Sequence, residues 1–138
     1  MVTNTRIHVQ TGGECELIDI TRQVEQKVEE AGVSNGTVTL FVAGSTAGVT
    51  TIEYERGVVS DFQGMWDRTV PRNIPYRHDA AWGDGNGHAH VRASMLGPSL
   101  VVPFVSKRLT LGTWQQIVLV DFDNRPRSRD IVVQIMGE

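Results

Sequence analysis

The sequence has only one cysteine, Cys15, and no hydrophobic run that approaches the ~20 residues a membrane-spanning helix needs. A lone cysteine cannot form a disulfide within the chain, so nothing in the sequence requires an oxidising compartment. The first ten residues also lack the apolar segment of a signal peptide. We therefore expect a cytoplasmic protein that has no contact with a membrane.

An excess of positive charge is absent as well. Thirteen lysines and arginines stand against sixteen acidic residues, which leaves a net charge of −3. That balance excludes the broadly basic surface with which proteins bind nucleic acids or anionic membranes. The last third of the chain is locally basic through Lys107, Arg108, Arg125, Arg127 and Arg129. We interpret this basic cluster as a solvated surface, with an anion-binding or subunit contact as the alternative.

Hydrophobic residues make up 40% of the 138 positions, enough for one folded domain spanning residues 1–138. β-rich segments predict strands at 7–9, 14–20, 37–43, 49–54, 100–105, 114–122 and 131–136. The first two should form a hairpin across a turn at Thr11-Gly12-Gly13. Apolar periodicity predicts helices at 20–31, 57–69 and 87–96. Because the helices do not alternate regularly with the strands, this order indicates an α+β fold with helices on one side of a sheet.

Three of the four histidines fall within thirteen positions. They are His78, His88 and His90, and the same stretch contains Asp79, Asp84 and Asn86 with glycines at 83, 85 and 87. Imidazoles and carboxylates are metal ligands and proton carriers near neutral pH, so we expect a chemical site here. The alternative is an ordinary loop in which Asp and Asn side chains bond turn amides and the histidines are surface or capping groups.

The spacing of His88 and His90 depends on the local structure. On a strand the two rings would share one face and suit a common ion. On the helix predicted from residue 87 they would diverge by roughly 200°, which argues against joint ligation unless the helix begins later. Asn86 stands where it could cap that helix.

Two further segments are weaker candidates. The small residues Gly44-Ser45-Thr46-Ala47-Gly48 lie between two predicted strands, where hydroxyls and free amides could hold a phosphate or carboxylate, although such runs are more often tight turns. Glu53 could supply a carboxylate or simply face solvent. In Leu111-Gly112-Thr113-Trp114-Gln115-Gln116 we expect Trp114 to pack in the core or against a subunit, while Gln115 could face a cleft.

Read together, these segments resemble the YjbQ-like family, also called secondary thiamine-phosphate synthase. The matching stretches are Gly44-Ser45-Thr46-Ala47-Gly48-Val49-Thr50-Thr51-Ile52-Glu53, Tyr76-Arg77-His78-Asp79, Asp84-Gly85-Asn86-Gly87-His88-Ala89-His90, Ser94-Met95-Leu96-Gly97-Pro98-Ser99-Leu100 and Leu111-Gly112-Thr113-Trp114-Gln115. The resemblance implies one YjbQ-like domain, a twisted, mainly antiparallel sheet or sandwich with two or three helices packed on it, and a homotrimer. The activity it implies joins an aminopyrimidine diphosphate to a thiazole phosphate and releases pyrophosphate.

The resemblance also implies a histidine-rich site near subunit boundaries. His78 and His90 would be its firmest members, with Asp84, Asn86 and His88 beside them and Glu53 and Gln115 as weaker candidates. We expect His78, His88 and His90 to ligate a divalent metal, zinc or magnesium. Ser45 and Thr46 would hold the anionic group of a small phosphorylated molecule.

One departure from the family pattern concerns Gly44, where many relatives have histidine. If that histidine ligates a metal, this site has one ligand fewer, and either His88 substitutes for it or binding is weaker. The alternatives to the implied activity are a metal-dependent hydrolase and a noncatalytic trimer that binds a metal or an anion.

Overall fold

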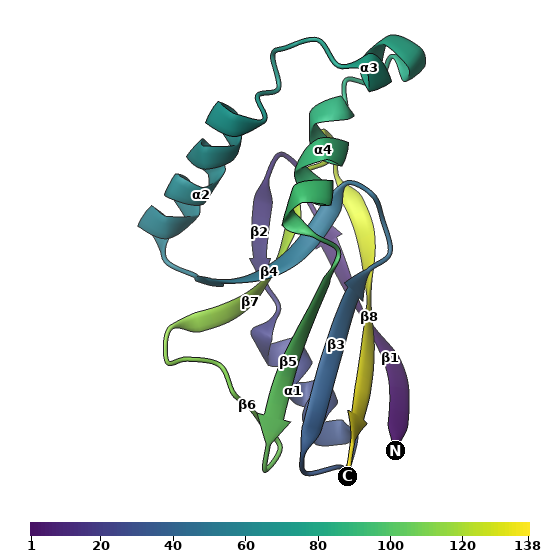
Figure 1. Ribbon diagram of the computed structural model, residues 1–138, viewed down its shortest axis with the longest axis vertical. Helices are drawn as coiled ribbons and strands as arrows, with labels where there is room; N and C mark the ends of the chain where they lie inside the picture. The colour runs from purple at the N-terminus through teal and green to yellow at the C-terminus, as the bar shows by residue number, and fades with distance from the viewer.

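The computed structural model describes all residues 1–138 and contains two antiparallel sheets (Figure 1). The five-stranded sheet has the order β1 (Val2–Thr11), β8 (Arg127–Gly137), β3 (Gly36–Val42), β5 (Ser99–Val105), β6 (Arg108–Leu109). The three-stranded sheet has the order β2 (Glu16–Asp19), β7 (Gln115–Asp121), β4 (Ala47–Glu53). The helices are α1 (Thr21–Glu30), α2 (Arg56–Thr69), α3 (Arg77–Trp82) and α4 (Gly87–Leu96). The predicted α+β class and antiparallel architecture are confirmed.

The hairpin expected from the first two strands is wrong. β1 pairs with β8 in the larger sheet, whereas β2 pairs with β7 in the smaller one. Gly13, Glu14 and Cys15 all have left-handed backbone conformations, which turn the chain out of one sheet and into the other. At Gly13 the turn also passes close to the connection between β7 and β8, where a Cβ atom on residue 13 would lie 2.5 Å from the carbonyl oxygen of Asp123.

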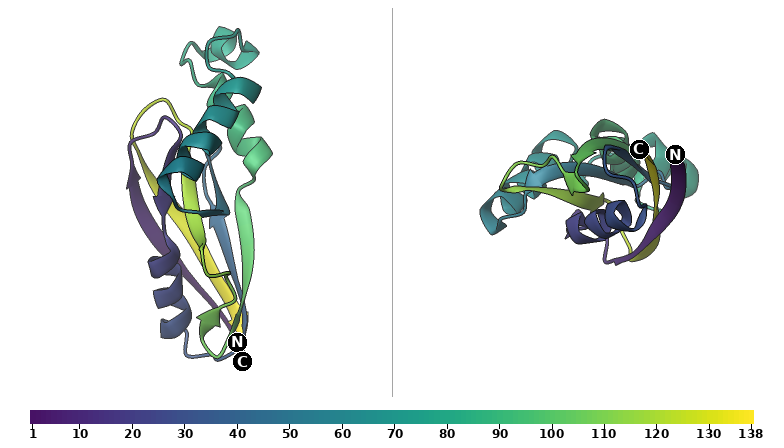
Figure 2. Two further views of the ribbon diagram at one scale, coloured as in Figure 1. Left: turned by 90° about the vertical axis from the view of Figure 1, so that its left-hand side faces the viewer. Right: turned by 90° about the horizontal axis from the view of Figure 1, so that it is seen from below.

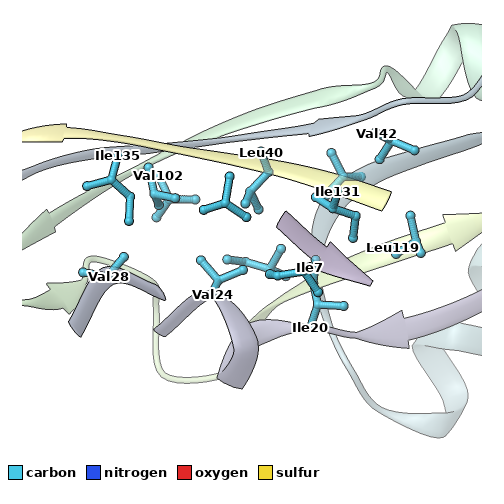
Figure 3. Packing of buried hydrophobic residues seen from close by; sticks show 14 of the residues in the cluster. Ile7, Ile20, Val24, Val28, Leu40, Val42, Val102, Leu119, Ile131 and Ile135 are labelled. Carbon is cyan, nitrogen blue, oxygen red and sulfur yellow. The ribbon is translucent and has the colours of Figure 1, made fainter. Parts of the chain in front are cut away.

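The main hydrophobic core lies between α1 and the inner faces of both sheets. Ile20, directly before α1, and Val24 and Val28 within it follow one another at intervals of four residues, so all three face inward. Figure 3 shows them opposite Leu40 and Ile135, which come from β3 and β8. All five are buried. The apolar periodicity that predicted the first helix therefore corresponds to the face that the helix buries in the core.

β7 is buried on both of its faces because it lies in the middle layer of the molecule. Ile117 and Leu119 point into the main core, while Val118, Val120 and Phe122 belong to a second cluster with α2 and α4. In this cluster the rings of Trp66 and Phe122 meet edge to face with centroids 5.1 Å apart. The helices α2 and α4 thus cover the smaller sheet on the side away from α1 (Figure 2), so the prediction that the helices lie on one side of a sheet is wrong for this sheet.

The predicted helices at 57–69 and 87–96 match α2 and α4 closely. The six-residue helix α3 was not predicted, since it is too short to show an apolar period. Close approach fixes α4 on β4, because a Cβ atom at Gly48 would lie 2.6 Å from the carbonyl oxygen of Gly97. None of the helices combines the length and the apolar character needed to cross a bilayer.

Candidate functional site

The loop between α3 and α4 folds back on itself at one end of the molecule (Figure 1). Gly83 and Gly85 have φ values of 67° and 65°, a left-handed conformation that glycine adopts without steric cost. The start of α4 also needs a glycine, because a Cβ atom at Gly87 would lie 2.6 Å from the Cβ of Tyr76. Tyr76 is therefore held directly against α4, and its hydroxyl donates to the carbonyl of Pro71 at 2.5 Å. These constraints bring α3 alongside the loop.

His78, Asp79 and Asp84 converge in this loop. Each offers one ligand atom, and these atoms lie within 4.8 Å of one another. The Nδ1 atom of His78 is 3.3 Å from Asp84 Oδ1 and 3.8 Å from Asp79 Oδ1. It is sealed from solvent and none of its contacts has the geometry of a hydrogen bond. We call these three residues the His78 cluster.

Backbone groups at the start of α4 orient the two carboxylates of the His78 cluster. Asp79 Oδ1 accepts a hydrogen bond from the Gly87 amide at 2.8 Å, and Asp84 Oδ1 accepts one from the Asn86 amide at 3.2 Å. The side chain of Asn124 donates to the Asp84 carbonyl at 2.6 Å. Such supporting bonds hold ligand side chains in one orientation. They also satisfy the first amides of α4, which otherwise lack acceptors.

Asn86 stands at the N-cap position of α4, as predicted, but the expected capping by its side chain is wrong. Its side chain makes no capping hydrogen bond and points instead into the protein. There its amide nitrogen donates to Asp123 at 3.1 Å and its oxygen accepts from the Asn124 amide at 3.1 Å. Asn86 therefore joins the loop of the His78 cluster to the β7–β8 connection.

The other two histidines of the stretch diverge, as the helical spacing requires. The ring of His90 lies next to that of His78, with centroids 4.3 Å apart and planes tilted by 39°. The ring of His88 is buried on the opposite side of α4 near Tyr76. Burial lowers the pKa of His88, and the positive charge of Arg92 adds to that effect. The structure thus brings His90, but not His88, to the His78 cluster.

A buried network of charged side chains lies next to the loop of the His78 cluster, to which Asn86 connects it. Asp121 is fully buried and accepts from Nε and Nη2 of Arg129 at 2.7 and 2.9 Å. It also accepts from the Thr11 hydroxyl at 2.6 Å and the Asp123 amide at 3.0 Å. The interpretation of the basic cluster as solvated is therefore wrong for Arg129, whose side chain is only 8% exposed.

Asp123 is the second carboxylate of this network. Burial alone would raise the pKa of Asp123, but hydrogen bonds from Asn86, Thr46 and Arg127 outweigh it and hold the pKa below its ordinary value. The spacing of charged residues in the sequence is consistent with this arrangement. Acidic residues two apart, Asp121 and Asp123, stand at and just after the end of β7, and arginines two apart, Arg127 and Arg129, begin β8 and share one face of that strand.

The remaining predicted site residues are dispersed. Thr46 is buried, and its hydroxyl donates to Asp123 and accepts from Arg129, whereas Ser45 is exposed. Glu53 and Gln115 pair across the far ends of β4 and β7, away from α3 (Figure 1). Both are exposed, and Gln115 donates to the Thr51 hydroxyl at 2.9 Å. Within this chain the structure does not bring them to the His78 cluster.

Trp114 does not enter the core, since 73% of it is exposed. It lies in the connection between β6 and β7, just before Gln115. The expectation of core packing is therefore wrong, and the expectation of a subunit contact stays a prediction.

The chain is similar to proteins of archaea and bacteria along nearly its whole length. It is 36% identical to a UPF0047 protein of Methanothermobacter thermautotrophicus, over 99% of this chain and 94% of the relative. It is 38% identical to a UPF0047 protein of Archaeoglobus fulgidus, over 93% of this chain and 97% of the relative. A crystal structure from Sulfolobus solfataricus superposes with a TM-score of 0.90 at 36% identity and covers 100% of both chains. The fold described above is therefore shared with these proteins.

The descriptions of these relatives overturn one expectation. The homologues are called only UPF0047 proteins, and the Sulfolobus structure is described as a YbjQ-like protein of unknown function. A similar structure from Clostridium acetobutylicum, with a TM-score of 0.88 at 35% identity over 96% of this chain and 99% of that one, is described as an uncharacterized conserved protein. The predicted thiamine-phosphate-synthase activity is therefore wrong as a function taken from the family.

The motif resemblance itself is confirmed. A family model described as UPF0047 protein YjbQ-like matches residues 5–138, which include every motif that carried the resemblance. The chain therefore belongs to the YjbQ-like UPF0047 family.

Proposed function

We propose that this protein binds a divalent metal ion of the zinc type at the His78 cluster. The observation that carries the proposal is the convergence of one imidazole nitrogen and two carboxylates within 4.8 Å. His78 Nδ1 supports it because this atom is sealed from solvent, has no hydrogen bond and lies between the two carboxylates. A buried polar atom without a partner is rare and calls for a ligand or a proton.

Electrostatics favours a cation between these groups. The two carboxylates and the Nδ1 atom of the imidazole can each donate an electron pair to a cation that lies between them. A metal ion supplies this positive charge and bonds to all three. The mixed nitrogen and oxygen donors suit Zn²⁺, whereas Mg²⁺ prefers a shell made only of oxygen atoms.

Three protein ligands would leave coordination positions open for water or a second ligand. His90 stands at the edge of this space, with its ring against that of His78. The amide bonds from Gly87 and Asn86 to the two aspartates provide the outer support that metal ligands usually have. The function that this geometry supports best is reversible binding of a metal ion that remains accessible to small ligands.

The test is the metal content of untagged, dialysed protein, measured by mass spectrometry for the wild type and single variants. We expect about one zinc-type ion per chain in the wild type and its loss in His78→Ala and Asp84→Asn. His8→Ala is the matched control, because His8 is also ion-paired to an aspartate but lies exposed on β1. A metal-free wild type that also fails to take up added Zn²⁺ would refute the proposal.

We further propose that the protein is a homotrimer in which the outer face of the five-stranded sheet makes contacts between subunits. Phe41, Val101 and Met136 stand on the neighbouring strands β3, β5 and β8, and about half of each is exposed. In Figure 1 the helix α1 lies behind this sheet, and no helix covers the face toward the viewer. Several exposed large apolar side chains on a sheet face that no helix covers are typical of a subunit contact.

Light scattering after size-exclusion chromatography tests the assembly. We expect a mass about three times the 15.2 kDa of one chain, and a smaller mass for Phe41→Asp. A monomeric wild type at the concentrations used for the metal measurement would contradict this part of the proposal.

A further inference from the structure

Arg129 has one guanidinium nitrogen that the buried network does not use. Nε and Nη2 donate to Asp121, and Nη2 also donates to the Thr46 hydroxyl at 2.6 Å, but no hydrogen bond involves Nη1. The side-chain nitrogens that are both sealed from solvent and without a partner belong to Trp66, His78 and His88. Nη1 of Arg129 is not among these nitrogens, so this atom reaches the surface. The side chain as a whole is only 8% exposed.

Gly44 is the residue that leaves Nη1 accessible. It lies in an exposed bend two residues after the end of β3, and a Cβ atom built there would be 2.7 Å from Nη1. That distance is too short for any ordinary contact between a carbon and a nitrogen atom. Three hydrogen bonds hold the guanidinium in place, so it could not move aside freely. Any side chain at position 44 would therefore cover or displace Nη1.

The turn that follows Gly44 adds further unused donors. The amides of Ser45 and Thr46 donate no hydrogen bond to any backbone or side-chain acceptor in the chain. The Ser45 hydroxyl is exposed and also without a partner. By contrast, the neighbouring amides of Ala43 and Gly44 donate to the carbonyls of Asp130 and Val42. Unused donors thus begin at Ser45 and lie next to the open guanidinium nitrogen.

We propose that Arg129 Nη1 and the Gly44–Thr46 turn form a binding site for the oxyanion of a phosphate group. A guanidinium nitrogen beside unused main-chain amides and a hydroxyl suits phosphate oxygens. Asp121 already neutralises the charge of Arg129, so directed hydrogen bonds rather than net charge hold the anion. The affinity for inorganic phosphate is accordingly modest, with a Kd on the order of 1 mM.

This site is chemically independent of the proposed metal site, although the network connects the two. The Thr46 hydroxyl and the side-chain amide of Asn86 both donate to Asp123. The backbone amide of Asn86 in turn donates to Asp84 of the His78 cluster. The phosphate site contains no metal ligand and requires no metal. Its failure and the failure of metal binding can therefore be distinguished by working with protein from which metal has been removed.

The experiment is a phosphate titration of EDTA-treated, ¹⁵N-labelled protein at constant ionic strength, followed by NMR. We expect saturable shifts of the Ser45 and Thr46 amides and of the Arg129 side-chain resonances in the wild type. Gly44→Ala should raise the Kd at least about tenfold. Gly112→Ala is the matched control, because this exposed loop glycine has no atom closer than 3.6 Å to a Cβ built on it. It should bind phosphate as the wild type does.

A parallel titration with methyl phosphate distinguishes the two sources of the group. Tighter binding of the ester than of inorganic phosphate identifies a phosphorylated molecule as the ligand, and equal or weaker binding identifies free phosphate. The proposal is overturned if wild-type shifts do not saturate, if they occur away from residues 44–46 and Arg129, or if folded Gly44→Ala binds with unchanged affinity. The wild-type measurement decides the matter even if Gly44→Ala does not fold.

Discussion

Arg129→Met should destabilise the protein strongly, since it leaves the fully buried Asp121 without its charged partner. The substitution keeps most of the side-chain volume but removes three hydrogen bonds, two to Asp121 and one to Thr46. The hydrogen bonds from Thr11 and from the Asp123 amide would remain. Removal of one partner from a buried ion pair costs about 3–5 kcal/mol. That loss is a large share of the ~5–15 kcal/mol by which native domains are stable.

The assay is urea-induced unfolding at one fixed protein concentration, with the free energy of unfolding extrapolated to water. Arg6→Met is the control, because Arg6 is paired with Asp130 at 3.8 Å and both side chains are about half exposed. Exposed pairs contribute roughly 0–1 kcal/mol, so this variant should stay close to the wild type. If Arg129→Met lost less than about 1 kcal/mol, the reasoning that the network is buried and tightly paired would be refuted.

Three other predictions concern pH, thiol reactivity and packing. Because the pKa of His88 is lowered in the folded protein, this side chain is protonated at a higher pH in the unfolded chain than in the folded one. The free energy of unfolding should therefore fall as the pH drops below about 6.5. In unfolding measurements across pH, His88→Gln should flatten that fall, and an unchanged slope in this variant would contradict the assignment. Burial raises the pKa of the Cys15 thiol to about 11, so the native protein should react slowly with a disulfide reagent at about pH 8. Rapid reaction of the thiol before the protein unfolds would contradict this prediction. Gly87→Ala should lower the melting temperature by costing about 1–3 kcal/mol through its 2.6 Å clash with Tyr76, and an unchanged melting curve would disprove that constraint.

Local patterns were sufficient for most elements of secondary structure. The intervals of three and four between apolar residues predicted α1, α2 and α4, and runs of β-branched residues predicted the central strands. These patterns succeed because an amphipathic helix and a buried strand each record their own periodicity in neighbouring residues. The divergence of His88 and His90 is another local property, since it follows from the helical rotation per residue alone.

Pairing between distant segments was not predictable in the same way. β1 and β2 are neighbours in sequence and looked like a hairpin, yet each pairs with a strand more than 90 residues away. The sequence predicted a turn at Thr11-Gly12-Gly13, but Glu14 and Cys15, which are also left-handed and are not glycine, gave no sign that this turn leads into the other sheet. Which strands pair depends on the burial of whole sheet faces, and that is a property of the complete fold.

The composition, the helical periodicity and the motif series determined the class of this protein, its family and the stretch in which a site should be sought. Only the tertiary structure decided which residues meet. It joined His78 to Asp84 through two left-handed glycines and buried Arg129 although its neighbours in sequence suggested a solvated surface. The physical reason is that a side chain's charge and identity are local, while its burial and its partners depend on segments that approach only after the chain has folded.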